Sequence, residues 1–216
     1  MNHQIVVYIL IAYVISFVPF VGRYVSMINT LVHENGHAIA ALLFSGKVYS
    51  IKLFQNTEGL AVTGQRGWLA TVAISYAGYT FSSIVAYLCF YFLKQGQENL
   101  ILYALISIAI LNLILWIRNV YGAVWLISFI VCCGWTIQNG SDSVQTFLSY
   151  FLSAVLLTQS VSSALQIFLL SLFRSKRAGD ATSLAHYTKV PAIVWGFLFF
   201  AQSVYIAYLA IANHFN

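Results

Sequence analysis

Hydrophobic residues in this chain gather into seven long runs, which short polar stretches separate. Each run is close to the ~20 residues that a helix needs to cross the hydrocarbon core of a bilayer. One helix through the fourth and fifth runs would be far too long, so we divide them at the tight turn Arg118-Asn119. The pattern predicts an all-α polytopic membrane protein with about seven transmembrane helices. Their expected bounds are residues 4–21, 24–44, 68–93, 99–117, 120–137, 144–173 and 190–212.

Two connecting segments are long enough to hold structure of their own. Residues 45–67 contain two short β-prone runs on either side of the polar turn Asn56-Thr57-Glu58-Gly59. This arrangement predicts a β-hairpin after the second helix. Residues 174–189 are basic and are followed by Pro191, which can begin the last helix. The sequence contains no repeat and no mark of a domain boundary, so we expect a single domain over residues 1–216.

Composition indicates a membrane protein rather than a soluble one. Of the 216 residues, 61% are hydrophobic and 7% are charged, whereas a soluble domain carries about 25% charged residues. The net charge of +5 could indicate a nucleic-acid partner. However, the basic residues fall between the hydrophobic runs, where membrane topology explains them. We therefore expect the lipid bilayer, and no nucleic acid, as a partner.

The distribution of Lys and Arg predicts the orientation of the helices. With the N-terminus in the cytosol, seven spans place only Arg23 and Lys94 outside. This bias agrees with the positive-inside rule, and it leaves the C-terminus outside. The cytosolic basic residues are then Lys47, Lys52, Arg66, Arg118, Arg174, Lys176, Arg177 and Lys189.

The second hydrophobic run contains the motif His33-Glu34-Asn35-Gly36-His37. Residues four apart share one face of a helix, so the two imidazoles can coordinate one metal ion. Glu34 projects beside them and can act as a general base toward water on the metal. Zinc suits this site because it accepts imidazole and lowers the pKa of bound water. Ionisable side chains within a span are costly and usually functional, which favours a metal site over a structural histidine pair.

A catalytic zinc ion generally has three protein ligands, so a third donor is expected elsewhere in the chain. At about 1.5 Å per residue, the histidines lie roughly 12–18 Å from the cytosolic end of their helix. The candidates on that side are Glu58 in the hairpin and Asp180 and His186 before the last span. We predict Asp180 as the ligand. The alternative is that Asp180 caps a helix over residues 181–187.

At these residues the chain resembles the site-2 protease class of intramembrane zinc metallopeptidases. Residues 31–46 carry the closest match, with a His-Glu-x-Gly-His core followed by small residues and a Ser-Gly turn. The expected hairpin stands where such proteases have a membrane-associated one, and residues 179–195 are similar to a late motif of compact members. An Asn-Pro…Asp-Gly motif in a later span and an inserted PDZ domain are both missing. The resemblance implies a protease of a bacterial plasma membrane that acts on membrane-protein or peptide substrates.

Asn119, in the turn between the fourth and fifth runs, is a candidate substrate-binding residue. Its side-chain amide could help to stabilise an oxyanion from the cytosolic side. The alternative is that Asn119 is an ordinary turn residue.

These observations favour hydrolysis of peptide bonds in or near transmembrane segments. Zinc would be held by His33, His37 and Asp180, with Glu34 activating water. The alternative is a non-catalytic membrane scaffold or partner protein descended from such a protease, but a pseudoenzyme has no need to keep Glu34. A third interpretation is a transporter that uses the His/Glu cluster for ions or protons. Transporters often contain internal repeats, and none is found here.

Overall fold

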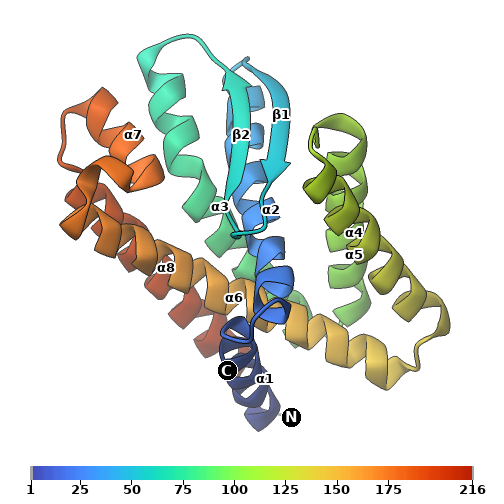
Figure 1. The fold of residues 1–216 in the computed structure, drawn as a ribbon. Helices are drawn as coiled ribbons and strands as arrows, with labels where there is room; N and C mark the ends of the chain where they lie inside the picture. The colour runs from blue at the N-terminus through green and yellow to red at the C-terminus, as the bar shows by residue number, and fades with distance from the viewer. Residues whose placement is uncertain (1, 216) are drawn as a thin grey trace.

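The computed structural model describes residues 2–215, and helices account for most of them (Figure 1). An antiparallel hairpin of β1 (Lys47–Leu53) and β2 (Gly59–Gly64) follows the second helix. The predicted helical membrane fold with a hairpin at this place is confirmed. The helices are α1 (Asn2–Ser16), α2 (Val21–Leu43), α3 (Trp68–Lys94), α4 (Glu98–Leu115), α5 (Val120–Asn139), α6 (Asp142–Phe173), the 3-10 turn η1 (Ser175–Arg177), α7 (Gly179–Thr188) and α8 (Ala192–Phe215).

The number of membrane crossings differs from the expected seven. Among the described residues, α3, α4, α5, α6 and α8 are each long and apolar enough to cross a bilayer, as befits an integral membrane protein. Ile5–Ser16 and Val21–Leu43 meet this criterion only as a pair, which is bent by 109°. The break between them contains Pro19, whose ring and missing N–H interrupt an α-helix. The described part of the chain therefore contains five or six candidate spans.

Both ends of the chain lie at the same end of the molecule, away from the hairpin (Figure 1). The ring of Tyr8 on α1 lies 5.3 Å from that of Tyr150, and the ring of His214 on α8 lies 6.4 Å from the same tyrosine. This arrangement differs from the seven full crossings that the sequence predicted, which would place the two chain ends at opposite ends of the molecule. The side of the membrane that each end faces stays a prediction. The physical reason is that α1 and α2, bent by 109° at a break that contains Pro19, count as one candidate span at most and not as two.

The hairpin folds back along α2. At its tip, the Thr30 hydroxyl donates a hydrogen bond of 2.7 Å to the Thr57 carbonyl, so the tip lies level with the middle of α2 (Figure 1). The outer edge of β1 is occupied, because the Ile51 N–H donates to the Trp116 carbonyl at 2.7 Å and the Arg118 N–H donates to the Ile51 carbonyl at 3.3 Å. Within the described sheet, β2 has the free edge.

Candidate active site

The middle of α2 presents His33, Glu34 and His37, and the last two are buried. The backbone carbonyl of Ile74 on α3 lies 2.6 Å from His37 Nδ1. A carbonyl oxygen can only accept, so Nδ1 carries a proton, and Nε2 is the ring nitrogen that can bind a metal ion once it is deprotonated. This contact fixes both the tautomer and the ring orientation that a metal ligand requires.

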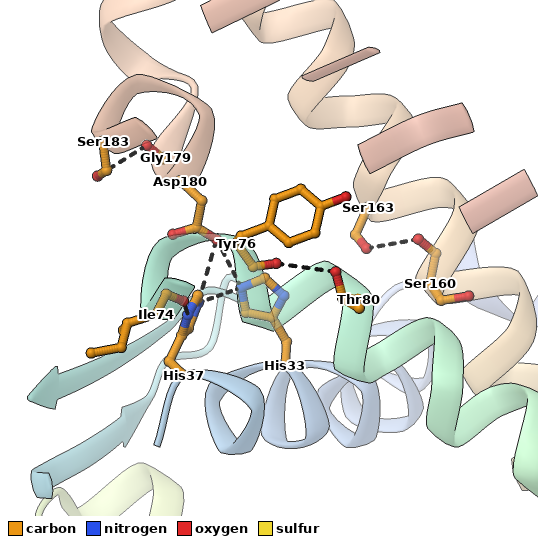
Figure 2. A network of polar contacts seen from close by, with 10 residues as sticks. All are labelled: His33, His37, Ile74, Tyr76, Thr80, Ser160, Ser163, Gly179, Asp180 and Ser183. Carbon is orange, nitrogen blue, oxygen red and sulfur yellow. Dashed lines mark hydrogen bonds and ion pairs between the residues drawn. The ribbon is translucent and has the colours of Figure 1, made fainter. Parts of the chain in front are cut away.

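Asp180, at the start of α7, points at both histidines (Figure 2). Its Oδ2 atom lies 3.2 Å from His33 Nε2 and 3.3 Å from His37 Nε2. The two Nε2 atoms are themselves 3.0 Å apart. The structure thus brings the three predicted ligand residues together, although Asp180 comes from a different part of the chain.

The position of α7 explains how Asp180 reaches the histidines. Ala181 and Leu184 are buried in one cluster with Tyr79 of α3. The Trp68 indole N–H donates a hydrogen bond of 2.7 Å to the Tyr187 carbonyl, which ties the far end of α7 to the start of α3. Asp180 lies in the first turn of α7 and makes no cap hydrogen bond, so the capping alternative is not what the structure shows.

Electrostatics keep the Asp180 carboxyl group ionised. Burial by itself would raise its pKa, but the charge of His37 and hydrogen bonds from both histidines hold the pKa well below its ordinary value. The positive end of the α7 dipole acts in the same direction. A deprotonated carboxylate is the form that coordinates a metal ion.

The distances among the three donor atoms fit a tetrahedral ion. Zinc bonds of about 2 Å at the tetrahedral angle separate neighbouring ligands by about 3.3 Å, and the observed separations are 3.0, 3.2 and 3.3 Å. Two imidazoles with one carboxylate are also a known ligand set of catalytic zinc. The residues present therefore fit zinc.

The profile of the Peptidase M50B-like family matches residues 6–210. The chain belongs to this family. The resemblance to the related site-2 proteases is thereby confirmed, and the M50 peptidases are zinc-dependent. No curated protein and no solved structure matches the chain.

Two glycines that the sequence analysis did not single out leave space for the side chains and helix packing at this M50B-like site. A Cβ at Gly78 on α3 would come within 2.5 Å of His33 Nε2 and 2.7 Å of His37 Nε2. A Cβ at Gly36 would meet the Ala77 carbonyl at 2.8 Å, so this glycine lets α2 and α3 approach closely. The only sequence signal was a glycine inside an apolar helix, which often marks close packing.

A hydrogen bond between α2 and α4, which the sequence analysis also did not identify, holds α2 in place. Asn35, within the motif, donates to the Leu31 carbonyl at 2.7 Å and accepts a hydrogen bond of 2.9 Å from the Asn112 amide of α4. Both asparagines are buried. The available signal was the polar Asn112 within the apolar residues 108–115 of α4, since such residues often join helices in a membrane.

The side chain of Asn119, the predicted substrate-binding residue, bonds to the backbone of β1 and not to a group at the histidines. Its amide donates to the Leu53 carbonyl at 2.6 Å, and its Oδ1 accepts from the Leu53 N–H at 3.2 Å. Asn119 does not line the cavity at the histidines. In this structure its side chain joins the start of α5 to β1, and the amide NH2 group that would stabilise an oxyanion already donates to the backbone of β1.

A cavity of about 710 Å³ opens beside the histidines. Its walls come from α2, β2, α3, α6 and α7, and they include the free edge of β2. Polar residues of the long apolar helix α6 also face it, namely Gln159, Ser163 and Gln166. This M50B-like chain therefore has space for water and for a peptide next to the candidate ligands.

Proposed function

We propose that the chain is an intramembrane zinc metalloprotease that hydrolyses peptide bonds in or near transmembrane segments. The observation that carries this proposal is the convergence of His33, His37 and Asp180 on one point within 3.0–3.3 Å of one another. Glu34 lies next to them on α2 and is buried. A hydrolytic metal site needs metal ligands that converge on one point and a nearby general base. Two imidazoles and a carboxylate supply the ligands here, and Glu34 supplies the base.

His33, His37 and Asp180 would hold the zinc ion. When bound, zinc supplies Lewis acidity, which makes water acidic enough to react near neutral pH. Glu34 accepts the proton of the attacking water and passes it to the amine that leaves. Gly59 of β2 lies against this carboxylate, since a Cβ there would come within 2.5 Å of Glu34 Oε1. The close backbone of β2 limits the positions that the Glu34 side chain can take.

The free edge of β2 supports a specific mode of substrate binding. A transmembrane helix hides its carbonyls in internal hydrogen bonds, so it must unwind locally before hydrolysis. An unwound segment could pair with the exposed backbone of β2 by strand addition. Gly59, Leu60, Ala61 and Thr63 of this strand line the same cavity as the histidines. The paired segment would therefore lie within reach of Glu34.

The arrangement of basic residues supports access from the cytosol. The hairpin and α7 lie at the same end of the molecule, because Trp68 joins the start of α3 to Tyr187. That end carries the basic segment 174–189 and the hairpin lysines, whereas Lys94 lies at the other end. By the positive-inside rule the hairpin end faces the cytosol. The cavity would then open toward the cytosolic half of the membrane.

The test compares wild type with Glu34→Gln. This substitution keeps the size of the side chain and removes the base, so it should retain the fold and bound zinc. Turnover of membrane-spanning peptides in detergent or liposomes should fall by about 10²–10⁴-fold, the usual contribution of general-base catalysis. Wild type should contain about one zinc ion per chain, as a mononuclear site requires. His33→Ala and His37→Ala should lose it.

Two results would contradict the proposal. Equal cleavage by wild type and Glu34→Gln would assign the activity to another site or to a contaminant. A wild-type protein with bound zinc that cleaves none of a broad peptide panel would favour the non-catalytic scaffold.

A further inference from the structure

The cavity beside the histidines continues to the tip of the hairpin, where Glu58 lines it. The tip is held against α2 by the hydrogen bond from Thr30 to the Thr57 carbonyl. Ser26, Asn29 and Thr30 of α2 line this part of the cavity as well. We call Ser26, Asn29, Thr30, Thr57 and Glu58 the tip pocket.

The backbone around Glu58 is fixed, while its carboxylate is not engaged in an ion pair. The Phe54 N–H donates to the Glu58 carbonyl at 2.9 Å, and the Glu58 N–H donates to Asn56 Oδ1 at 3.3 Å. The described residues form ion pairs only between Asp180 and the two histidines. The Glu58 side chain is exposed and lines the cavity, so its carboxylate is open to a cation that enters there.

Asn29 supplies a second unsatisfied acceptor. Its side chain is 5% exposed, lines the cavity, and has an Oδ1 atom that is buried without a hydrogen-bond partner among the described residues. An unpaired buried carbonyl is unfavourable by the cost of its lost hydration. Rotation of the amide by a half turn exchanges Oδ1 and Nδ2, so Asn29 can present its acceptor to a ligand in the cavity.

We propose that the tip pocket binds a lysine or arginine side chain of the substrate, close to the bond that is cut. This inference rests on the proposed protease function and names the substrate class for that site. The pocket offers a carboxylate, an amide oxygen and hydroxyl groups, which are acceptors. Lysine and arginine side chains carry donors only and a positive charge, so they match both the hydrogen bonding and the charge.

The distance to the reacting groups fits such a role. Glu58 precedes Gly59, which is in contact with the Glu34 carboxylate. Thr30 lies one helical turn from Glu34 on α2. A side chain that enters the tip pocket therefore comes from a substrate residue near the scissile bond, and its charge would set the register of the unwound segment along β2.

The experiment uses membrane-spanning peptides that are identical except for one residue, which is Lys, Gln or Glu and is moved through successive positions. Binding is measured by fluorescence anisotropy on zinc-loaded Glu34→Gln, and cleavage is measured on wild type. At one or two positions the Lys peptide should bind up to about fivefold more tightly than the Gln peptide, as expected for a solvent-exposed charge pair. Glu58→Gln in the same background should abolish the difference. Glu58→Lys should favour the Glu peptide.

Glu98→Gln is the matched control, because it removes an acid at the opposite end of the bundle and should leave the Lys preference intact. Zinc content and thermal unfolding of each variant establish that it is folded. A Lys preference at no position, or a preference that survives in folded Glu58→Gln, would overturn the inference. If Lys-dependent binding is found but wild type cleaves no peptide, the pocket stands and the proposed protease function fails.

Discussion

Gly78 on α3 lies directly against the imidazole of His33, so that a Cβ at this position would come within 2.5 Å of His33 Nε2. Neither the backbone at Gly78 nor the His33 side chain can shift easily to make space, because the two residues belong to closely packed helices. Gly78→Ala should therefore displace one or both histidines and weaken zinc binding by about 10–100-fold, the usual cost of disturbing the surroundings of a metal ligand. Zinc affinity can be measured by competition with a chromogenic chelator.

Gly134→Ala provides the control for this prediction. A Cβ at Gly134 on α5 would meet nothing within 4 Å, so the substitution should leave zinc binding unchanged. If Gly78→Ala binds zinc as tightly as Gly134→Ala does, the close fit between α3 and the histidines is not needed for the site.

Asp180→Asn should weaken zinc binding by more than the ~10–100-fold that loss of an outer contact costs. The substitution keeps the shape of the side chain but removes the negative charge that faces the two Nε2 atoms. Asp142→Asn is its control, since Asp142 lies in the first turn of α6 at the far end of the molecule. Equal zinc content in the two variants under limiting zinc would exclude Asp180 as a ligand.

Asn112→Leu should destabilise the protein while leaving the ligands in place. It removes the hydrogen bond from Asn112 to Asn35, so the buried Oδ1 of Asn35 loses its donor. The cost should be about 1–2 kcal/mol of unfolding free energy, which thermal unfolding in detergent can detect. Asn139→Leu tests the specificity of the effect, because Asn139 is exposed and bonds only within its own helix. Equal melting temperatures for the two variants would contradict a stabilising role for the Asn35–Asn112 contact.

Cysteine labelling can test the position of the termini. With the hairpin end in the cytosol, a cysteine at Ser175 should react with an impermeant reagent only from the cytosolic side. Cysteines at Asn2 and Asn213 should both react only from the outside, because the two chain ends share one end of the molecule. The background should lack Cys89, Cys132 and Cys133. Labelling of Asn2 and Asn213 from opposite sides would mean that α1 and α2 do not together make one crossing.

Several features followed from local sequence alone. The hydrophobic runs predicted the helices because each run is close to the ~20 residues that a helix needs to cross the bilayer core. The β-prone runs around Asn56-Thr57-Glu58-Gly59 predicted the hairpin, since turn residues and strand propensity act over a few positions. The spacing of His33 and His37 placed both on one face of α2, because helical geometry fixes residues four apart. The family resemblance added a reason to single out Asp180.

Tertiary structure decided what depends on contacts between distant segments. The separation of Asp180 from the histidines depends on how α7 packs against α3, and no local rule gives that distance. That α1 and α2 form one candidate span at most could not be read from two apolar runs, because a break at Pro19 leaves hydrophobicity unchanged while it redirects the chain. The sequence suggested that Asn119 could contact a substrate, but in the structure its amide is hydrogen-bonded to the backbone of β1. Periodicity fixes which face of a helix a residue occupies, whereas packing determines what that face meets.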